Sequence, residues 1–344
     1  MNSDPRSSPP LLSAIIACPD NYQTVRRLTQ YLRVQTIRDQ IELVYIMPSA
    51  ADFNFHEEDM AEMWGYQLVE IGDFPSLNIP RAKGIQVAKA DIVVYTEDHC
   101  YPAADWAEHL VKAHEGPWAA VGPQIGLANA HSYTSWANFF IQYVSWMRPS
   151  EGGIAEDVPG HNSSYKRKIL LEYGDELFHQ TIFDTAMNQD LRRKGYELYV
   201  EPKALAFHLF MTNVMPFMRE NFVIGRAYAN TRSQSMKLWE RILRFCLAPV
   251  VPFIRIKRVI DEIKNRGWEK QLLPGIIPPL FRGLVFSALG EAAGWLFGLG
   301  KSMEVSMELD FHRERFIAQN ERDRVLSDEL YDFSSDPIEP TISK

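Results

Sequence analysis

Short apolar runs alternate with helical patterns over the first hundred residues of the chain. The runs at residues 11–17, 41–47 and 92–95 are typical of buried strands, because they are short and strongly apolar. Residues 24–33 and 78–90 carry apolar side chains at helical spacing. Strand–helix–strand units at this short spacing predict a parallel sheet with crossover helices, in which ligands bind at the carboxyl ends of the strands.

Three potential metal ligands, Glu97, Asp98 and His99, directly follow the last of these apolar runs. We therefore expect them at the carboxyl end of a strand, where parallel sheets bind their ligands. Paired acids with an imidazole suit a divalent cation that carries a phosphate ester. The alternative interpretation is a solvated turn whose charges bind nothing.

Composition bounds the class of protein. The chain has 344 residues, 46% of them hydrophobic, which suffices for one large domain and an appendage. A net charge of −8 argues against broad nucleic-acid binding. The three cysteines, Cys18, Cys100 and Cys246, show no zinc or disulfide spacing and fit a reducing compartment. Residues 1–10 are polar and rich in Pro and Ser, so we expect a flexible N-terminus without a signal peptide.

Residues 216–305 combine positive charge with apolar stretches. Between residues 219 and 266, eleven Lys and Arg stand against four Asp and Glu, a local net charge of +7. The apolar run at 272–299 contains three prolines and two charges, whereas a simple spanning helix needs about 20 largely uncharged residues. We therefore predict hairpin or in-plane helices at a membrane interface, with the basic residues beside an anionic cytoplasmic leaflet.

Two alternatives for residues 216–305 stay open, namely a buried helical subdomain and a dimer interface. The tail at 306–344 is charged and then rich in Ser, Pro and acidic residues. We expect this tail to be partly disordered, because such a composition buries little apolar surface.

Four sequence blocks resemble, in their order and spacing, the inverting family 2 glycosyltransferases of the bacterial polysaccharide and glycolipid type. They are an opening strand and turn, an arginine-containing helix, the position of the family's DxD motif, and a donor- and acceptor-side loop, at residues 13–21, 78–91, 95–99 and 160–167. The resemblance implies a GT-A fold over residues 11–215. This is a Rossmann-like α/β domain with a mostly parallel sheet flanked by helices, followed here by the membrane-associating helical region at 216–305.

The resemblance also implies a nucleotide-sugar donor whose diphosphate is neutralised by Mn²⁺ or Mg²⁺. His99 departs from the acid that the family usually carries at the third DxD position, and Mn²⁺ tolerates an imidazole ligand better than Mg²⁺ does. The implied metal ligands are Asp98, His99 and His208. The implied donor-binding residues are Pro19, Asp20, Arg81, Glu97, Asp98 and Asn162.

Inversion requires a carboxylate that takes the proton of the acceptor hydroxyl as it attacks the anomeric carbon. Asp184 is the candidate base, because the family carries an acidic motif on a helix upstream of a Gly-Tyr pair, found here at residues 195–196. Phe183 replaces the more usual first acid of that motif. The structural alternative for Asp184 is a helix-start carboxylate that binds backbone N–H groups. The other acids, which fit the spacing less well, are Asp190 and Asp175.

The expected partners are a nucleotide-sugar donor, a glycan or polyprenyl-linked lipid acceptor, and a membrane surface, with no nucleic acid. We expect a cytoplasmic protein, peripheral on the inner face of the cell membrane; a homo-oligomer is compatible with the sequence. A catalytically impaired, glycosyltransferase-like scaffold stays open because of the departures at His99 and Phe183. A nucleotidyltransferase is disfavoured, because residues 18–21 lack the Gly and the basic residue of its phosphate loop.

Overall fold

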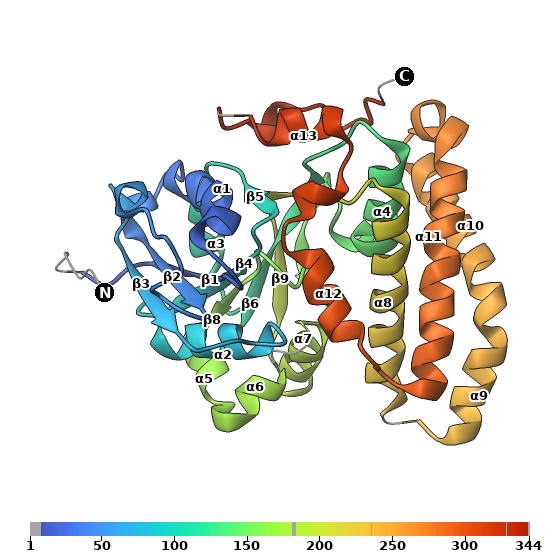
Figure 1. Cartoon of the computed structure of the whole chain (residues 1–344), viewed down its shortest axis with the longest axis horizontal. Coiled ribbons are helices and arrows are strands. Elements are labelled where there is room, and N and C mark those ends of the chain that lie inside the picture. The colour runs from blue at the N-terminus through green and yellow to red at the C-terminus, as the bar shows by residue number, and fades with distance from the viewer. Residues whose placement is uncertain (1–7, 181–183, 235, 328, 343–344) are drawn as a thin grey trace. The chain divides into compact units, whose positions relative to one another are not determined.

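The computed structural model describes residues 8–180, 184–234, 236–327 and 329–342 (Figure 1). The predicted flexible N-terminus therefore lies, up to residue 7, outside the described residues. The chain divides into two compact units. Unit 1 comprises Met1–Gly126, Ser145–His208 and Asp332–Ser334, and unit 2 comprises Leu127–Val144, Leu209–Tyr331 and Ser335–Lys344.

Unit 1 is built on a nine-stranded sheet in the order β3-β2-β1-β4-β8-β6-β9-β5, with β7 paired to β9. Strands β3, β2, β1 and β4 are parallel neighbours, as the alternation of strand and helix patterns predicts. Their bounds are β1 (Leu12–Ala17), β2 (Ile41–Met47), β3 (Gly65–Glu70) and β4 (Ile92–Thr96).

The other half of the sheet is antiparallel in the pairs β4–β8, β6–β8, β5–β9 and β7–β9. The sheet is thus mixed, and the expectation of a mostly parallel sheet is corrected. Antiparallel pairing needs no crossover helix, so these strands join the sheet without the alternation on which the prediction depended. Their bounds are β5 (Cys100–Pro102), β6 (Ala120–Leu127), β7 (Gly153–Ala155), β8 (Ser164–Lys166) and β9 (Leu198–His208).

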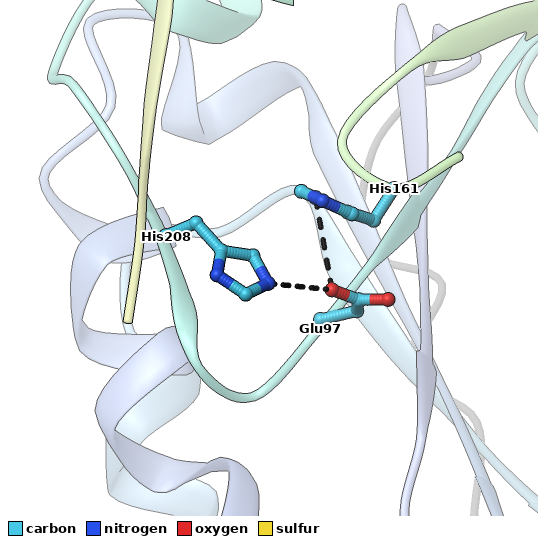
Figure 2. A group of neighbouring side chains, drawn as sticks. All are labelled: Glu97, His161 and His208. Atoms are coloured by element: carbon cyan, nitrogen blue, oxygen red, sulfur yellow. Dashed lines mark ion pairs between the residues drawn. The ribbon is translucent and has the colours of Figure 1, made fainter. Parts of the chain in front are cut away.

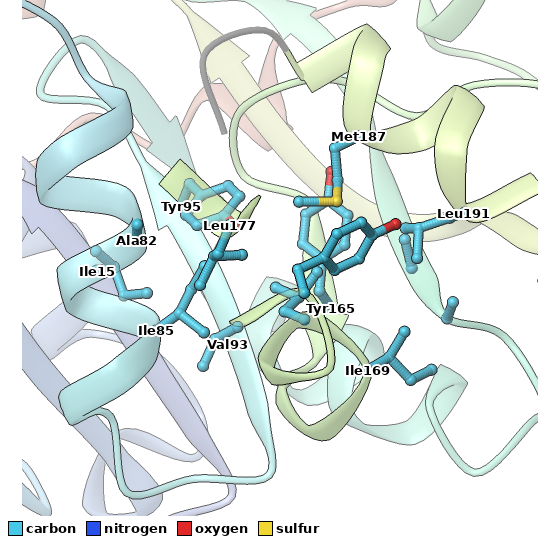
Figure 3. Packing of buried hydrophobic residues seen from close by; sticks show 14 of the residues in the cluster. Ile15, Ala82, Ile85, Val93, Tyr95, Tyr165, Ile169, Leu177, Met187 and Leu191 are labelled. Carbon is cyan, nitrogen blue, oxygen red and sulfur yellow. The ribbon is translucent and has the colours of Figure 1, made fainter. Parts of the chain in front are cut away.

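Helices pack on both faces of this sheet, because successive strand residues point to opposite sides. On one face, Ile15 and Val93 belong to the same apolar core as Ile85 of α2 (Figure 3). On the other face, the rings of Tyr22 in α1 and Tyr45 in β2 meet edge-on with centroids 5.9 Å apart. The helices of unit 1 are α1 (Tyr22–Arg33), α2 (Asn78–Val87), α3 (Trp106–Ala113), α5 (Arg167–Leu171), α6 (Leu177–Gln180) and α7 (Asp184–Arg193).

His114 follows α3 and is buried against β8, where its Nε2 lies 2.9 Å from Ser164 Oγ. Burial, reinforced by the charge of Lys166, lowers the pKa of His114 from 6.5 to about 3. Between these values the unfolded chain binds a proton that the folded protein excludes, so the free energy of unfolding rises with pH, by at most about 1.4 kcal/mol per pH unit. We expect His114→Gln to remove this contribution in urea unfolding between about pH 4 and pH 7.

His109→Gln is the matched control for this experiment. His109 lies in α3 and pairs with Asp105 at 3.3 Å, and its side chain is 25% exposed. A partly solvated pair contributes little to stability, so this variant should keep the wild-type pH dependence. If the free energy of unfolding rose with pH as steeply in His114→Gln as in the wild type, the buried neutral His114 would not be the source of that pH dependence.

Unit 2 is a helical unit in which α11 contacts α4, α8, α9 and α10. Figure 1 shows α11 between α8 on one side and α9 and α10 on the other. The helices are α4 (Tyr133–Gln142), α8 (Val214–Ser233), α9 (Leu238–Leu247), α10 (Val251–Asn265), α11 (Glu269–Phe297), α12 (Ser302–Asp310) and α13 (Gln319–Val325).

Helix α11 is continuous over 29 residues, although it contains Pro274, Pro278 and Pro279. The prolines therefore do not break this helix. An interior proline costs about 3 kcal/mol, which the packing of a long buried helix face offsets. Within the described ranges, α11 is the one helix long and apolar enough to cross a membrane, but 44% of its apolar window is buried inside the protein. A core helix has the same properties, so association with a membrane stays a prediction.

Glycines allow α8 and α11 to approach closely. A Cβ at Gly290 would lie 2.0 Å from the backbone oxygen of Phe222, and one at Gly294 would lie 2.4 Å from that of Arg226. Relief of such a contact requires a shift of α8 itself. We expect Gly290→Ala to lower the free energy of unfolding by about 1–3 kcal/mol, despite the better helix propensity of Ala, and thus to lower the thermal midpoint.

Gly275→Ala provides a comparison within the same helix. Its Cβ would lie 2.2 Å from the ring of Tyr133, a half-buried side chain rather than backbone. Because that ring can turn aside, we expect a smaller loss of stability than in Gly290→Ala. Equal losses in the two variants would contradict the explanation from interhelical spacing.

Candidate metal centre

The triplet Glu97, Asp98 and His99 lies at the carboxyl end of β4, in the short turn that leads into β5. The amide of Cys100 donates to the carbonyl of Glu97 at 3.1 Å and closes this turn. Antiparallel pairing then sets Cys100 opposite His208, the last residue of β9. The sheet thereby brings the end of β9 to the end of β4, although more than 100 residues separate them in the sequence.

His161 reaches the same place from the loop before β8. Its neighbour Asn162 donates its backbone N–H to the carbonyl of Tyr95 in β4 at 2.6 Å. Asn162 has a φ of +55°, a left-handed conformation that Asn tolerates better than most residues. This turn directs His161 toward Glu97, as Figure 2 shows.

The carboxylate oxygen Oε2 of Glu97 is the point on which the histidines converge. It lies 3.7 Å from His161 Nδ1 and 3.6 Å from His208 Nε2. The three potential ligand atoms of Glu97, His161 and His208 lie within 4.8 Å of one another (Figure 2). Both histidines are buried, and the Glu97 side chain is 16% exposed. Two imidazoles and one carboxylate are a donor set that fits a transition-metal ion such as Mn²⁺ better than Mg²⁺.

Asp98 and His99 lie beside this group and interact with each other. Asp98 Oδ1 is 2.7 Å from His99 Nδ1, a hydrogen bond that sets the orientation of the imidazole. His99 Nε2 lies 3.4 Å from Glu97 Oε2, and the His99 ring meets that of His208 edge-on at 4.8 Å. Of the ligands predicted from the sequence, the three-donor group therefore contains His208, whereas Asp98 contacts His99.

His161 is the residue that the sequence interpretation missed as a ligand. It lies within the block at 160–167 that carried the family resemblance, next to the predicted donor-binding residue Asn162. The sequence indicated only that this histidine follows Gly160 in a loop, and it is one of nine histidines in the chain. That signal is weak, because the position of the loop in the fold is what gives His161 its neighbours.

Two other predicted donor-binding residues have structural contacts. Asp20 follows Pro19 at the end of β1, and its Oδ1 accepts from the backbone N–H of Asn21 at 2.7 Å and from Thr24 Oγ1. Arg81 of α2 is buried, and its guanidinium lies over the ring of Tyr95 at 5.3 Å. These contacts hold both side chains near the ends of β1 and β4, and their roles in donor binding stay predictions.

Asn162 is held by the backbone of β5. Its Nδ2 lies 3.5 Å from the carbonyl of Cys100, and the whole residue is buried. Its Oδ1 is buried and accepts no hydrogen bond from the residues that the structure describes. A buried acceptor of this kind is costly unless a bound group satisfies it, which fits the prediction of a sugar or phosphate contact.

The predicted base Asp184 is the first residue of α7, but its side chain lies outside the described residues, as does Phe183. The alternative Asp190 accepts from Tyr173 OH at 2.7 Å and pairs with Lys194 at 3.1 Å. Asp175 is exposed in the short helical turn before α6. Asp190 is thus engaged in a structural pair, whereas the role of Asp184 stays a prediction.

No family model and no curated protein matches the chain. Among 170 matching chains of solved structures is the crystal structure of GalNAc-T7 with UDP, GalNAc and Mn²⁺. The two chains are 15% identical, the match covers 58% of this chain, and the TM-score is 0.46. The chain spans 43% of the length of that protein.

Proposed function

We propose that the protein is a glycosyltransferase that moves a sugar from a nucleotide-sugar donor to a glycan or lipid-linked acceptor with inversion. The observation that carries this proposal is the convergence of Glu97, His161 and His208 at the carboxyl end of β4. Strands β3, β2, β1 and β4 run parallel, and phosphorylated ligands bind at the carboxyl ends of strands in such sheets. The sequence blocks that resemble family 2 glycosyltransferases contribute residues to the same edge.

The three convergent side chains would hold a divalent metal, for which Mn²⁺ fits their donor atoms best. Such an ion would neutralise the diphosphate of the donor and of the departing nucleotide. Asp98 orients the imidazole of His99 beside this group through the hydrogen bond at Nδ1. Asp184 would take the proton of the acceptor hydroxyl. At the same time the oxygen of that hydroxyl would bond to the anomeric carbon of the donor sugar, and the bond from this carbon to the diphosphate would break.

The test is release of nucleoside diphosphate from a panel of nucleotide sugars, with a membrane extract as the source of acceptor. Wild-type protein is compared with Asp184→Asn in the presence of Mn²⁺, Mg²⁺ or EDTA. Asp175→Asn is the matched control, because it makes the same change at an exposed acid nine residues upstream, which is also one of the alternative bases. We expect Mn²⁺-dependent release from one donor, lost in Asp184→Asn and kept in Asp175→Asn. Donor binding without any release would instead favour a scaffold that has lost catalysis.

A further inference from the structure

Helix α9 and the start of α10 expose an unusual number of large apolar side chains. Nine of the 23 exposed large hydrophobic residues in the described chain fall between residues 238 and 254. None of the ten residues of α9 is buried. These nine residues, which we name the α9–α10 face, are Leu238, Trp239, Ile242, Leu243, Phe245, Leu247, Val250, Phe253 and Ile254.

The orientation of α9 is the reverse of that expected in a soluble protein. An amphipathic helix normally buries its apolar stripe and exposes its charges. Here the basic side contacts α11: Arg241 Nε donates to the carbonyl of Trp295 at 2.6 Å, and the Arg244 guanidinium lies 5.1 Å from the Trp295 ring centroid. The apolar side, which includes Leu238 and Trp239 at 64% and 61% exposure, faces away from the protein.

The apolar surface continues along the chain into α10. Val250, in the turn that joins the two helices, is 50% exposed, and Phe253 in α10 is 63% exposed. Phe253 also contacts the ring of Phe281 from α11, with centroids 6.1 Å apart. Figure 1 shows α9 and α10 beside α11 on its side away from α8, so the two helices form one outer layer of unit 2.

Charge around this face identifies the partner that it fits. From residue 237 to 258 there are six Lys and Arg and one Glu, a net charge of +5 in a chain whose total is −8. Of the six, Arg241 and Arg244 contact α11, and Arg255 pairs with Glu291 of α11 at 2.6 Å. Lys257 pairs with Asp261 at 2.6 Å on the solvent-exposed side of α10. Lys237, Lys257 and Arg258 are exposed at the two ends of the segment. A second copy of the same face would bring these exposed cations close to their own copies, whereas an anionic lipid surface offers apolar chains together with the opposite charge.

We propose that the α9–α10 face binds an anionic lipid bilayer, with the two helices lying in the headgroup region. A helix in the plane of the interface does not need the length of a membrane span, which suits a helix of ten residues. Helix α11 then stays in the core of unit 2. This inference is independent of the proposed glycosyl transfer, because it uses neither the metal centre nor a donor.

The test is flotation of the full chain with vesicles of phosphatidylcholine alone or of an equal mixture with phosphatidylglycerol. We expect binding to the anionic vesicles that weakens with salt, and little binding to the neutral ones. Trp239→Glu with Leu243→Glu should weaken binding by about tenfold or more, because it places charge in the apolar contact. Lys257→Gln with Arg258→Gln should weaken binding to the anionic vesicles and make the remaining binding less sensitive to salt.

Ile154→Glu is the matched control, because Ile154 is an equally exposed apolar residue in unit 1, at 66%. All variants are checked by circular dichroism, since these solvent-exposed side chains should leave folding unchanged. Equal vesicle binding by wild type and the Trp239–Leu243 double variant would overturn the proposal, as would no binding to anionic vesicles. Concentration-dependent dimers that are lost in the double variant, without vesicle binding, would assign the face to a second copy instead.

Discussion

Replacement of Glu97 by Gln is expected to abolish Mn²⁺-dependent turnover of the donor, with a loss of about 100-fold or more in both metal affinity and activity. Glu97 Oε2 lies within 3.4–3.7 Å of one nitrogen on each of three histidines, so it is the common neighbour of the site. An amide keeps the shape of the side chain but removes the negative charge that attracts the cation. Titration calorimetry with Mn²⁺ measures the loss of metal affinity. Release of nucleoside diphosphate from the donor measures the loss of activity.

Glu115→Gln supplies the control, because it makes the same chemical change at an exposed site outside the three-donor group. We expect it to bind Mn²⁺ as the wild type does. His161→Ala and Asp98→Asn then separate two arrangements of the ligands. Loss of Mn²⁺ affinity in His161→Ala, with a smaller loss in Asp98→Asn, supports the group seen here. A larger loss of Mn²⁺ affinity in Asp98→Asn than in His161→Ala would instead favour the ligands predicted from the sequence, which are Asp98, His99 and His208.

Replacement of Arg313 by Met is expected to destabilise unit 2 by about 3–5 kcal/mol, because it leaves the buried carboxylate of Glu220 without its cationic partner. Arg313 Nη1 lies 2.7 Å from Glu220 Oε1, and Nη2 lies 2.8 Å from Asp310 Oδ1. Arg313 and Glu220 are both almost fully buried. Burial acts to lower the pKa of Arg313, but the carboxylates of Glu220 and Asp310 outweigh it and raise that pKa above its ordinary value.

An exposed ion pair in the same unit provides the comparison. Arg219 and Glu308 lie 3.4 Å apart with side chains that are 47% and 63% exposed. Arg219→Met should therefore cost less than about 1 kcal/mol. Thermal unfolding of both variants measures the difference. In addition, Glu220→Gln combined with Arg313→Met should recover part of the loss, and a double variant no more stable than Arg313→Met would contradict the assignment of the cost to an unpaired Glu220.

The local elements of unit 1 could be predicted because each depends on short-range patterns. The strands β1, β2 and β4 and the helices α1 and α2 lie within a few residues of their predicted ranges. The strands are short, continuous apolar runs, and the helices carry apolar side chains at helical spacing, so both patterns are visible in the sequence. The antiparallel half could not be predicted in the same way, because β5, β7 and β8 have only three residues each and show no period.

The candidate site could be predicted in part for a related reason. The position of Glu97, Asp98 and His99 at a strand end follows from the apolar run that precedes them. Which of these side chains meets which histidine depends on pairing between distant segments. The pair Cys100–His208 places the end of β9 beside the turn, and the anchor of Asn162 on Tyr95 places His161 there.

The sequence by itself determined the alternation of strands and helices, the strand end that carries the acidic triplet, and the basic, apolar character of the C-terminal region. Only the tertiary structure decided that α11 continues through its prolines into the core, that α9 turns its apolar side outward, and that His161 joins Glu97 and His208. The physical reason is range: periodicity and turn chemistry act between neighbours in the chain, whereas burial and the convergence of ligands depend on which distant segments pack together.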